Sequence, residues 1–213
     1  MLNCPLCESD ISTNSFYSDS KRSYLNCSNC DLVFVDPQYH LDKAKEKARY
    51  DIHINSPFDS NYRQFLSQTL EPMLKLIPKK SKGLDFGCGP GPTLHLMFEE
   101  HGHSMSIYDP FYATEKKVLT HQYDFITATE VVEHLYTPLK TLAIVWDCLK
   151  PNGMLAIMTQ RQPEDFSKWG YINDCTHVSF FSEKSFDWLE NYWKAKIVFK
   201  NTNVVIFKKC NNT

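Results

Sequence analysis

The stretch LDFGCGPGPTLHLMFEEHGHSMSIYDP, residues 84–110, places a glycine-rich turn between an apolar run and a helical pattern. Gly87, Gly89 and Gly91 follow the apolar run directly, and glycines at such a turn let backbone N–H groups approach a ligand closely. A second apolar run follows and ends at Asp109, 22 residues after Gly87. The stretch therefore reads as strand, glycine-rich turn, helix and strand, with the turn placed to bind a ligand through its backbone.

The acidic residue at the tip of the second strand adds a ligand chemistry to this turn. A carboxylate in that place can accept hydrogen bonds from both hydroxyls of a ribose. The glycines form G-x-G-x-G with Asp85 before them, and no glycine stands where G-x-G-x-x-G would require it. The pyrophosphate-binding fingerprint of dinucleotide enzymes is therefore not met.

With these residues the chain resembles class I S-adenosylmethionine-dependent methyltransferases. Their first motif, an acidic residue followed by G-x-G-x-G, matches DFGCGPG at 85–91, and their acidic second-strand tip matches Asp109. The resemblance continues through QYDFITATEVVEHL, LKPNGMLAIMT and a terminal hairpin, and covers residues 61–209. It implies a doubly wound, mostly parallel, seven-stranded sheet of the Rossmann-like methyltransferase type.

The resemblance also implies S-adenosylmethionine as the cofactor and assigns residues to it. The glycine turn would pack against the methionine moiety and Asp109 would hold the ribose. The residue that meets the adenine in the family is not identifiable here, and Phe111 or Tyr112 could stack on the adenine instead. The cofactor-binding residues so implied are Asp85, Gly87, Gly89, Gly91, Asp109 and Phe111. Thirteen residues separate Asp109 from Tyr123, so the family's usual helix and third strand must be abbreviated here, to KKVLT.

A second group of polar residues lies in TATEVVEHL, residues 127–135, which holds Glu130, Glu133 and His134 within five positions. If this stretch opens a helix, positions i, i+3 and i+4 lie on one face and the three side chains converge. The resemblance puts them at the carboxyl end of the fourth strand and at the start of its helix. That is the ligand-binding edge of the sheet.

The pattern E-x-x-E-H resembles the metal-binding element of methyltransferases that make ubiquinone and of those that methylate the terminal 2′-hydroxyl of small RNAs. A further histidine completes the site in the RNA group, and His177 in NDCTHVSFF is the candidate here. Three interpretations stay open. The four residues ligate a divalent metal, or His134 or His177 is a metal-free general base, or the glutamates are first-turn charges and the histidines ordinary surface or core groups.

Four of the eight cysteines form the pattern C-x2-C-x19-C-x2-C, namely Cys4, Cys7, Cys27 and Cys30. Four thiolates from two tight turns satisfy tetrahedral zinc with no open position, which is typical of a structural site. A module of about 35 residues is too small to bury a sufficient core, so we expect the metal to hold it together. Free thiols or disulfides are the alternatives.

The charge of this module argues against contact with nucleic acid. Lys21 and Arg22 are its two basic residues and stand against five acidic ones, which gives a net charge of −3. An acidic module is a poor reader of phosphates, so RNA recognition is the minority interpretation. The whole chain has a formal charge of −2, with no bias toward nucleic acid or an anionic membrane.

The length of 213 residues allows one catalytic domain and a small appendage. We predict a zinc ribbon over 1–38, a linker or lid over 39–60 and the methyltransferase domain over 61–213. No apolar run approaches the length of a membrane span, and the N-terminus lacks the order of a secretory signal. These features predict a cytoplasmic protein without membrane contact.

The loop QRQPEDFSKWGYINDCTHVSFF, residues 160–181, is long and aromatic, which is typical of a lid or a substrate wall. Three residues from the amino-terminal side could complete that wall. The candidates are Trp169, Tyr171, Phe180, Phe181, Tyr50, His53 and Asn55.

These features predict an enzyme that transfers a methyl group from S-adenosylmethionine to a small-molecule acceptor, with an oxygen of a polar metabolite or sugar precursor as the expected acceptor atom. A hydroxyl is a poor nucleophile near neutral pH, and the Glu130, Glu133, His134 and His177 group addresses that difficulty, with or without a second divalent metal. One alternative is an RNA methyltransferase, because some ribosomal-RNA enzymes of the superfamily begin with a four-ligand zinc module. The other is a cofactor-binding scaffold without turnover.

Overall fold

The computed structural model describes residues 2–11, 15–52 and 55–211 and has a mostly parallel sheet at its centre. The sheet order is β5-β4-β6-β7-β10-β9. Its strands are β4 (Lys82–Phe86), β5 (Ser104–Tyr108), β6 (Tyr123–Thr129), β7 (Leu149–Met158), β9 (Lys196–Lys200) and β10 (Val204–Lys208). Strands β5, β4, β6 and β7 are parallel, whereas β10 runs antiparallel to both β7 and β9. The predicted α/β fold is confirmed.

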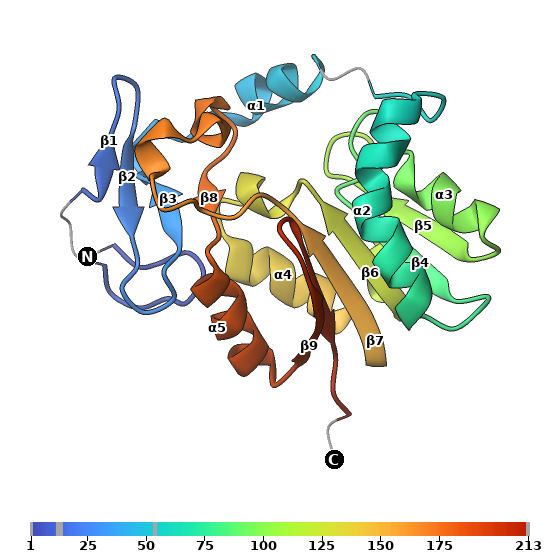
Figure 1. Cartoon of the computed structure of the whole chain (residues 1–213). Helices are drawn as coiled ribbons and strands as arrows, with labels where there is room; N and C mark the ends of the chain where they lie inside the picture. The colour runs from blue at the N-terminus through green and yellow to red at the C-terminus, as the bar shows by residue number, and fades with distance from the viewer. Residues whose placement is uncertain (1, 12–14, 53–54, 212–213) are drawn as a thin grey trace.

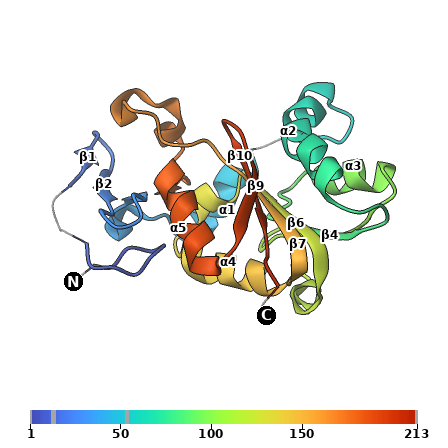
Figure 2. The same ribbon diagram turned by 60° about the horizontal axis from the view of Figure 1, so that its bottom comes forward.

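Helices cover both faces of this sheet, α2 (Ser60–Leu76) and α3 (Leu94–Glu100) on one side and α4 (Pro138–Asp147) and α5 (Glu183–Trp193) on the other (Figures 1 and 2). The alternation of side chains along the strands produces two separate cores. In β7, for example, Met154 and Met158 pack toward α2 and α3, while Leu155 and Ile157 pack toward α4 and α5.

The sheet contains six strands among the described residues, one fewer than predicted. The segment between β5 and β6 forms the 3-10 helix η2 (Lys116–Thr120) where the seven-stranded pattern has a helix and a strand. The predicted strand is missing because this segment is too short. A parallel crossover alone takes a dozen residues or more, before any further strand is added. The abbreviated KKVLT segment is therefore a single short turn of helix.

A second, antiparallel sheet lies beside α5 and joins segments that are far apart in the sequence (Figure 1). Its order is β1-β2-β3-β8, with β1 (Tyr17–Ser18), β2 (Ser23–Asn26), β3 (Val33–Val35) and β8 (Ser179–Phe180). The fourth strand comes from the long loop after β7. Strand β8 pairs with β3 at Val33 with Phe180 and at Phe34 with Ser179, so the amino-terminal strands are completed by the loop.

The remaining elements are short. Helix α1 (Lys43–Tyr50) is capped by the Asp42 carboxylate and lies between the amino-terminal strands and α2 (Figure 1). Besides η2, the 3-10 helices are η1 (Pro37–Tyr39), η3 (Val132–His134), η4 (Phe166–Lys168) and η5 (Gly170–Asn173). Among the described residues, none of the helices has the length and apolar character needed to cross a membrane.

Candidate active site

In the glycine turn after β4, two glycines pack closely against other residues of the chain and the third faces open space. Gly87 has φ +76°, and a Cβ there would lie 2.4 Å from Val131 Cγ2. A Cβ on Gly91 would lie 2.3 Å from the carbonyl oxygen of Asn55. At Gly89 the same position meets nothing within 4 Å. The turn therefore leaves open space over one main-chain segment, which fits a cradle for a ligand.

Asp109 links this turn to the segment that follows β5. Its Oδ2 accepts a hydrogen bond from the Gly89 amide at 3.1 Å. Its Oδ1 accepts from the amides of Phe111 at 2.8 Å and Tyr112 at 3.1 Å. The carboxylate is 7% exposed, so backbone donors fix its orientation at the tip of the strand. This is the place from which a carboxylate can reach a ribose.

Asp85 lies in β4 beneath the turn and is almost fully buried. Its Oδ1 accepts a hydrogen bond from the Thr127 hydroxyl at 2.8 Å. Burial raises the pKa of Asp85 to about 6; the nearby charge of Asp109 adds to the shift and the Thr127 hydrogen bond opposes it. Asp85 therefore supports the cradle from below with a carboxyl that titrates close to neutrality.

A cavity of about 590 Å³ connects the cradle with the second group of predicted residues. It lies between the glycine turn, α1, α2 and the segment after β6. The predicted site residues that line it are Asp85, Gly87, Gly89, Asp109, Phe111, Glu130, His134 and His177. Both halves of the predicted site thus open into one space.

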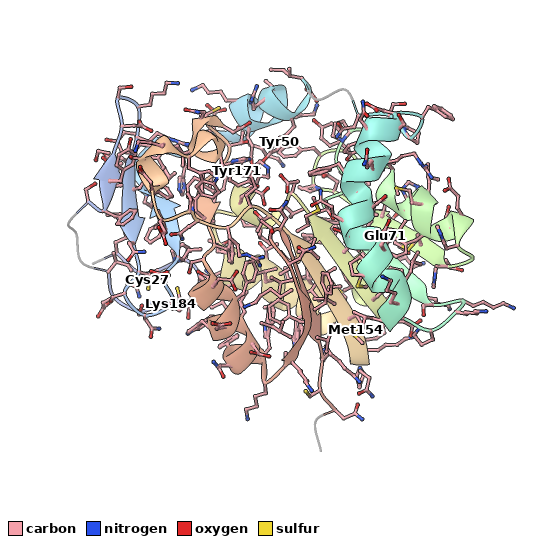
Figure 3. The ribbon with its side chains drawn as sticks, in the orientation of Figure 1. Cys27, Tyr50, Glu71, Met154, Tyr171 and Lys184 are labelled. Carbon is pink, nitrogen blue, oxygen red and sulfur yellow. The ribbon has the colours of Figure 1, made fainter. Side chains whose placement is uncertain are left out.

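The structure brings Glu133, His134 and His177 together: one potential ligand atom from each lies within 4.8 Å of the others. Glu130 stands outside this set of three, and the Tyr171 hydroxyl connects it to them. That hydroxyl donates to Glu133 Oε1 and to Glu130 Oε2, the latter at 3.3 Å. Tyr171, labelled in Figure 3, lies on the long loop after β7, and its ring centroid is 4.0 Å from that of His177.

The predicted α-helical face does not produce this arrangement. Glu130, the residue after β6, has φ +53°, and Val132–His134 form the 3-10 helix η3. Helix α4 begins only at Pro138. The left-handed residue and the tight turn leave Glu133 fully buried while His134 lines the cavity. The side chains converge instead because the loop after β7 brings His177 next to Glu133 and His134.

Hydrogen bonds to backbone carbonyls fix the tautomer of both histidines. His177 Nδ1 lies 2.7 Å from the Tyr171 carbonyl oxygen, and His134 Nδ1 lies 3.2 Å from that of Thr176. A carbonyl oxygen only accepts, so each Nδ1 carries the hydrogen and each neutral ring keeps a lone pair on Nε2. Burial and the neighbouring His134 lower the pKa of His177, against the opposing charge of Glu133. Its Nε2 is therefore available near neutral pH.

Glu133 is fully buried and Glu130 is half-buried, and among the described residues neither forms a salt bridge with a lysine or arginine. Burial raises the pKa of Glu130, and the charge of Glu133 raises it further. Burial also raises the pKa of Glu133, although His177 and the Tyr171 hydroxyl oppose the shift. Glu133 Oε2 has no hydrogen-bond partner among the described residues. A buried, unpartnered carboxylate oxygen beside two imidazole nitrogens is a donor set that fits a divalent transition metal.

The four predicted cysteines also meet. Sulfur–sulfur distances are 3.5 Å for Cys4 and Cys30 and 3.4 Å for Cys7 and Cys27, and all four atoms lie within 4.8 Å of one another. Zinc–sulfur bonds of about 2.3 Å give a tetrahedron with edges of about 3.8 Å. All four thiols are free of disulfides, so the cluster fits a four-thiolate metal centre. The cluster, in which Figure 3 labels Cys27, adjoins the start of α5, where the Ser185 hydroxyl donates to the Cys30 carbonyl at 2.9 Å.

The predicted substrate wall is only partly formed by the residues proposed for it. Tyr50 and Asn55 line the cavity. Phe180 and Phe181 are buried in hydrophobic clusters and pack instead of lining it. Trp169 stacks on Tyr171 with ring centroids 5.0 Å apart. His53 lies outside the described residues.

Sequence reasoning missed two features of the site. The first is Glu46 on α1, which lines the cavity and accepts a hydrogen bond from the Tyr50 hydroxyl at 2.9 Å. The helix-permissive run that contains it gave no sign of its side-chain direction. The second is Tyr171, which was expected in the wall but bridges the two carboxylates. Its spacing of 38 residues from Glu133 carries no local signal.

Comparison with known proteins adds a family to this geometry. Residues 58–191 match the family described as a methyltransferase domain. The chain is similar to a Burkholderia thailandensis 1,6-didemethyltoxoflavin-N1-methyltransferase with bound 1,6-didemethyltoxoflavin and S-adenosylhomocysteine, with a TM-score of 0.54 and 17% identity over 93% of this chain and 100% of that one. A second similar structure is a SAM-dependent methyltransferase from Archaeoglobus fulgidus, with a TM-score of 0.53 and 16% identity over 69% of this chain and 94% of that one. No curated protein matches the chain significantly.

Proposed function

Because the chain belongs to the methyltransferase family that its residues 58–191 match, we propose that it methylates an oxygen of a small polar metabolite or sugar precursor. It is an S-adenosylmethionine-dependent enzyme. One observation carries the choice of acceptor atom: the imidazoles of His134 and His177, each with its Nδ1 bonded to a backbone carbonyl, line the same cavity as the glycine cradle and Asp109.

The cradle would bind and orient the methyl donor. Asp109, fixed by three backbone amides, accepts hydrogen bonds from the ribose hydroxyls, and the open side of Gly89 leaves room for the methionine part. S-adenosylmethionine supplies a methyl group that is already activated, so the protein's main task is to hold the acceptor in line with it. Positioning of this kind can contribute about 7–11 kcal/mol to a bimolecular step.

The Glu133, His134 and His177 cluster addresses the weakness of a neutral hydroxyl as a nucleophile. An imidazole Nε2 within hydrogen-bond reach of that hydroxyl accepts its proton, an effect of about 10²–10⁴-fold in rate. A buried carboxylate beside the ring stabilises the imidazolium so formed. Amine and thiolate acceptors need less help of this kind, and therefore the cluster favours oxygen.

A divalent metal would be held by Glu133 Oε2 and by the Nε2 atoms of His134 and His177. Such an ion supplies a Lewis acid that lowers the pKa of a bound hydroxyl. The chelator experiment separates the two mechanisms. If the ion is needed, dialysis against a chelator that leaves the cysteine-bound metal in place should abolish turnover. Addition of Mn²⁺ or Zn²⁺ should then restore it. Unchanged turnover would assign the proton to a histidine alone.

The charge of the cavity favours an uncharged or cationic acceptor. Its described lining residues include the carboxyls of Glu46, Asp85, Asp109, Glu130 and Asp174 and contain no lysine or arginine. Lysine side chains of α1 lie over the rings of two aromatic residues at the rim, and one of them is paired with a carboxylate. An acceptor that carries phosphate would find no bidentate partner in this space.

We therefore expect no retention of RNA, which separates this proposal from an RNA methyltransferase. A fluorescent single-stranded RNA should show no shift in anisotropy with the protein at about 50 mM salt, because phosphate contacts require basic side chains. Binding with a log–log salt slope of several units would contradict the proposal and favour the RNA alternative.

The acceptor atom can be identified directly. The enzyme is incubated with S-adenosylmethionine that carries a ¹³C-labelled methyl group and with a small-molecule cell extract. The chemical shift of the labelled carbon in the product separates O-methyl from N-methyl and C-methyl groups. We expect an O-methyl signal that disappears with heat-inactivated enzyme, and an N-methyl or C-methyl product would overturn the choice of oxygen.

We propose structural zinc at Cys4, Cys7, Cys27 and Cys30, supported by sulfur–sulfur distances close to a tetrahedral edge. We expect metal analysis of the purified protein to find zinc, and to find one zinc ion fewer per chain in Cys30→Ser than in wild type. The melting temperature of Cys30→Ser should also be lower than that of wild type. Cys148→Ser is the matched control, because Cys148 is also buried but bonds only the Leu119 carbonyl. Equal zinc in wild type and Cys30→Ser would refute the site.

A further inference from the structure

Arg22 lies immediately before β2 and is buried, with 7% of its surface exposed. Its Nη1 donates to the carbonyl oxygens of Cys175 at 3.1 Å and His177 at 2.9 Å. Its Nη2 donates to those of Ile172 at 2.5 Å and Asp174 at 3.0 Å. One side chain of the amino-terminal module thus binds four backbone carbonyl oxygens within residues 172–177 of the loop that carries His177.

The chemistry of this contact is unusual for a buried arginine. Among the described residues Arg22 forms no ion pair within 4.0 Å, so its charge is balanced by carbonyl dipoles. Its Nε donates to the Tyr24 hydroxyl at 3.3 Å, and that hydroxyl donates to Asp19 Oδ2 at 2.8 Å. Asp19 also accepts from the Arg22 amide at 2.8 Å, so the arginine is held at both its ends.

The guanidinium of Arg22 supplies hydrogen-bond donors to all four converging carbonyl oxygens. Their dipoles point at one another, and without a cation between them the segment 172–177 would relax to separate them. The flat fork of a guanidinium meets four acceptors at once, whereas a lysine ammonium offers three donors from a single atom. The same segment fixes His177 through its Nδ1 bond to the Tyr171 carbonyl.

A second connection runs from the module to the buried glutamate. The amide of Val35 in β3 donates to the carbonyl of Val178 at 2.9 Å, and the amide of Val178 donates to the carbonyl of Glu133 at 2.7 Å. The module therefore touches the loop on both sides of His177 and, through one residue, the 3-10 turn that carries Glu133.

We propose that Arg22 is a positioning residue for methyl transfer. By gathering the carbonyls of 172–177 it sets where His177 Nε2 and the Tyr171 hydroxyl stand relative to Glu133, although it touches neither the acceptor nor S-adenosylmethionine. The amino-terminal module then acts on the chemical step through the loop. This inference rests on the proposed role of His177.

The test compares Arg22→Lys with wild type and with Arg63→Lys, a control whose arginine pairs with Glu100 on the α2 and α3 face. Arg22→Lys should lower kcat by about 10–10²-fold, the range expected when a catalytic group is misplaced by about 1 Å. Its Kd for S-adenosylmethionine in calorimetry should stay within about twofold of wild type. Amide exchange should quicken in 172–178 and stay unchanged in β4, β6 and β7.

Chemical rescue supplies a readout that a purely structural role would not give. Arg22→Ala should regain part of its kcat on addition of methylguanidinium and none on addition of methylammonium. The proposal is overturned if Arg22→Lys keeps full kcat, if its loss of rate follows weaker binding of S-adenosylmethionine, or if the variant unfolds throughout. An absence of rescue in a folded Arg22→Ala protein would also count against it.

Parallel measurement of His177→Asn separates this inference from the function on which it rests. If His177→Asn keeps full kcat, the proposed role of the histidine cluster fails, whatever Arg22 does. If His177→Asn loses activity while Arg22→Lys retains it, only the positioning role of Arg22 fails.

Discussion

Replacement of His177 by asparagine should lower kcat by about 10²–10⁴-fold, with the Kd for S-adenosylmethionine unchanged within about twofold. Asparagine Nδ2 can take over the hydrogen bond that His177 Nδ1 makes to the Tyr171 carbonyl, so the loop keeps its contact. It offers no group in the place of Nε2. Both interpretations of the cluster, as metal ligands or as a general base, use that atom. Steady-state kinetics and calorimetry on the same preparations give the two quantities.

His103→Asn is the matched control for this variant. His103 is also buried, at 9% exposure, and packs edge-on against Phe98 and Phe125 away from the cavity. It should retain kcat within about twofold, with the cost confined to stability. Full kcat in His177→Asn would remove the histidine from the reaction and leave the acceptor to be activated by other groups.

Asp109→Ala should weaken the binding of S-adenosylmethionine by about 10²-fold or more. The carboxylate is expected to accept hydrogen bonds from two ribose hydroxyls, and each such bond to a charged group is worth about 1.5–3 kcal/mol. A loss of about 3 kcal/mol corresponds to about 10²-fold in Kd. The amides of Gly89, Phe111 and Tyr112 would lose their acceptor at the same time, which loosens the cradle further. Titration calorimetry measures the change.

Two further variants test whether the weaker binding comes from loss of the Asp109 carboxylate. Asp109→Asn keeps one oxygen acceptor and should fall between wild type and Asp109→Ala. Asp124→Asn is the control, because Asp124 lies near the amino end of β6 and pairs with Lys150 at 2.7 Å, at the edge away from the cavity. An Asp109→Ala protein that binds S-adenosylmethionine as tightly as Asp124→Asn would show that this carboxylate does not hold the ribose.

The cradle could be predicted from the sequence because its parts are local. Gly87, Gly89 and Asp109 belong to one strand–turn–helix–strand unit. The glycines that the turn needs and the carboxylate at the strand end can therefore be recognised within a stretch of about 25 residues. The four cysteines are a similar case, since each pair lies in one turn. The apolar runs on either side of the glycine turn likewise indicated the strands at 82–86 and 104–108.

The cluster of Glu133, His134 and His177, for which we propose a catalytic role, could be predicted only in part. Glu133 and His134 were identified by their spacing, but the reason for their convergence was wrong, because a left-handed Glu130 and a 3-10 turn stand where an α-helix was expected. Periodicity does not encode such a turn. The groups that complete the cluster, Tyr171 and the backbone around His177, lie in an irregular loop whose path is fixed by tertiary contacts.

Arg22 illustrates the limit most clearly. Its partners lie 150 to 155 positions away and are carbonyl oxygens, which every residue possesses. In the sequence it counted only as one of two positive charges in an acidic module. The pairing that sets its role is visible only when the amino-terminal strands are seen beside the loop.

The strand shared between β3 and β8 has a consequence for how chains of this kind can evolve. Modules joined only end to end can be exchanged by recombination at the linker. Here an exchange at residue 39 would remove β3, the strand that pairs with Ser179 and Phe180. The unpaired edge of β8 would then be prone to aggregation. Selection must therefore treat the amino-terminal ribbon and the catalytic sheet as a single heritable unit. A descendant that discarded the ribbon would have to recruit another segment to cover that edge.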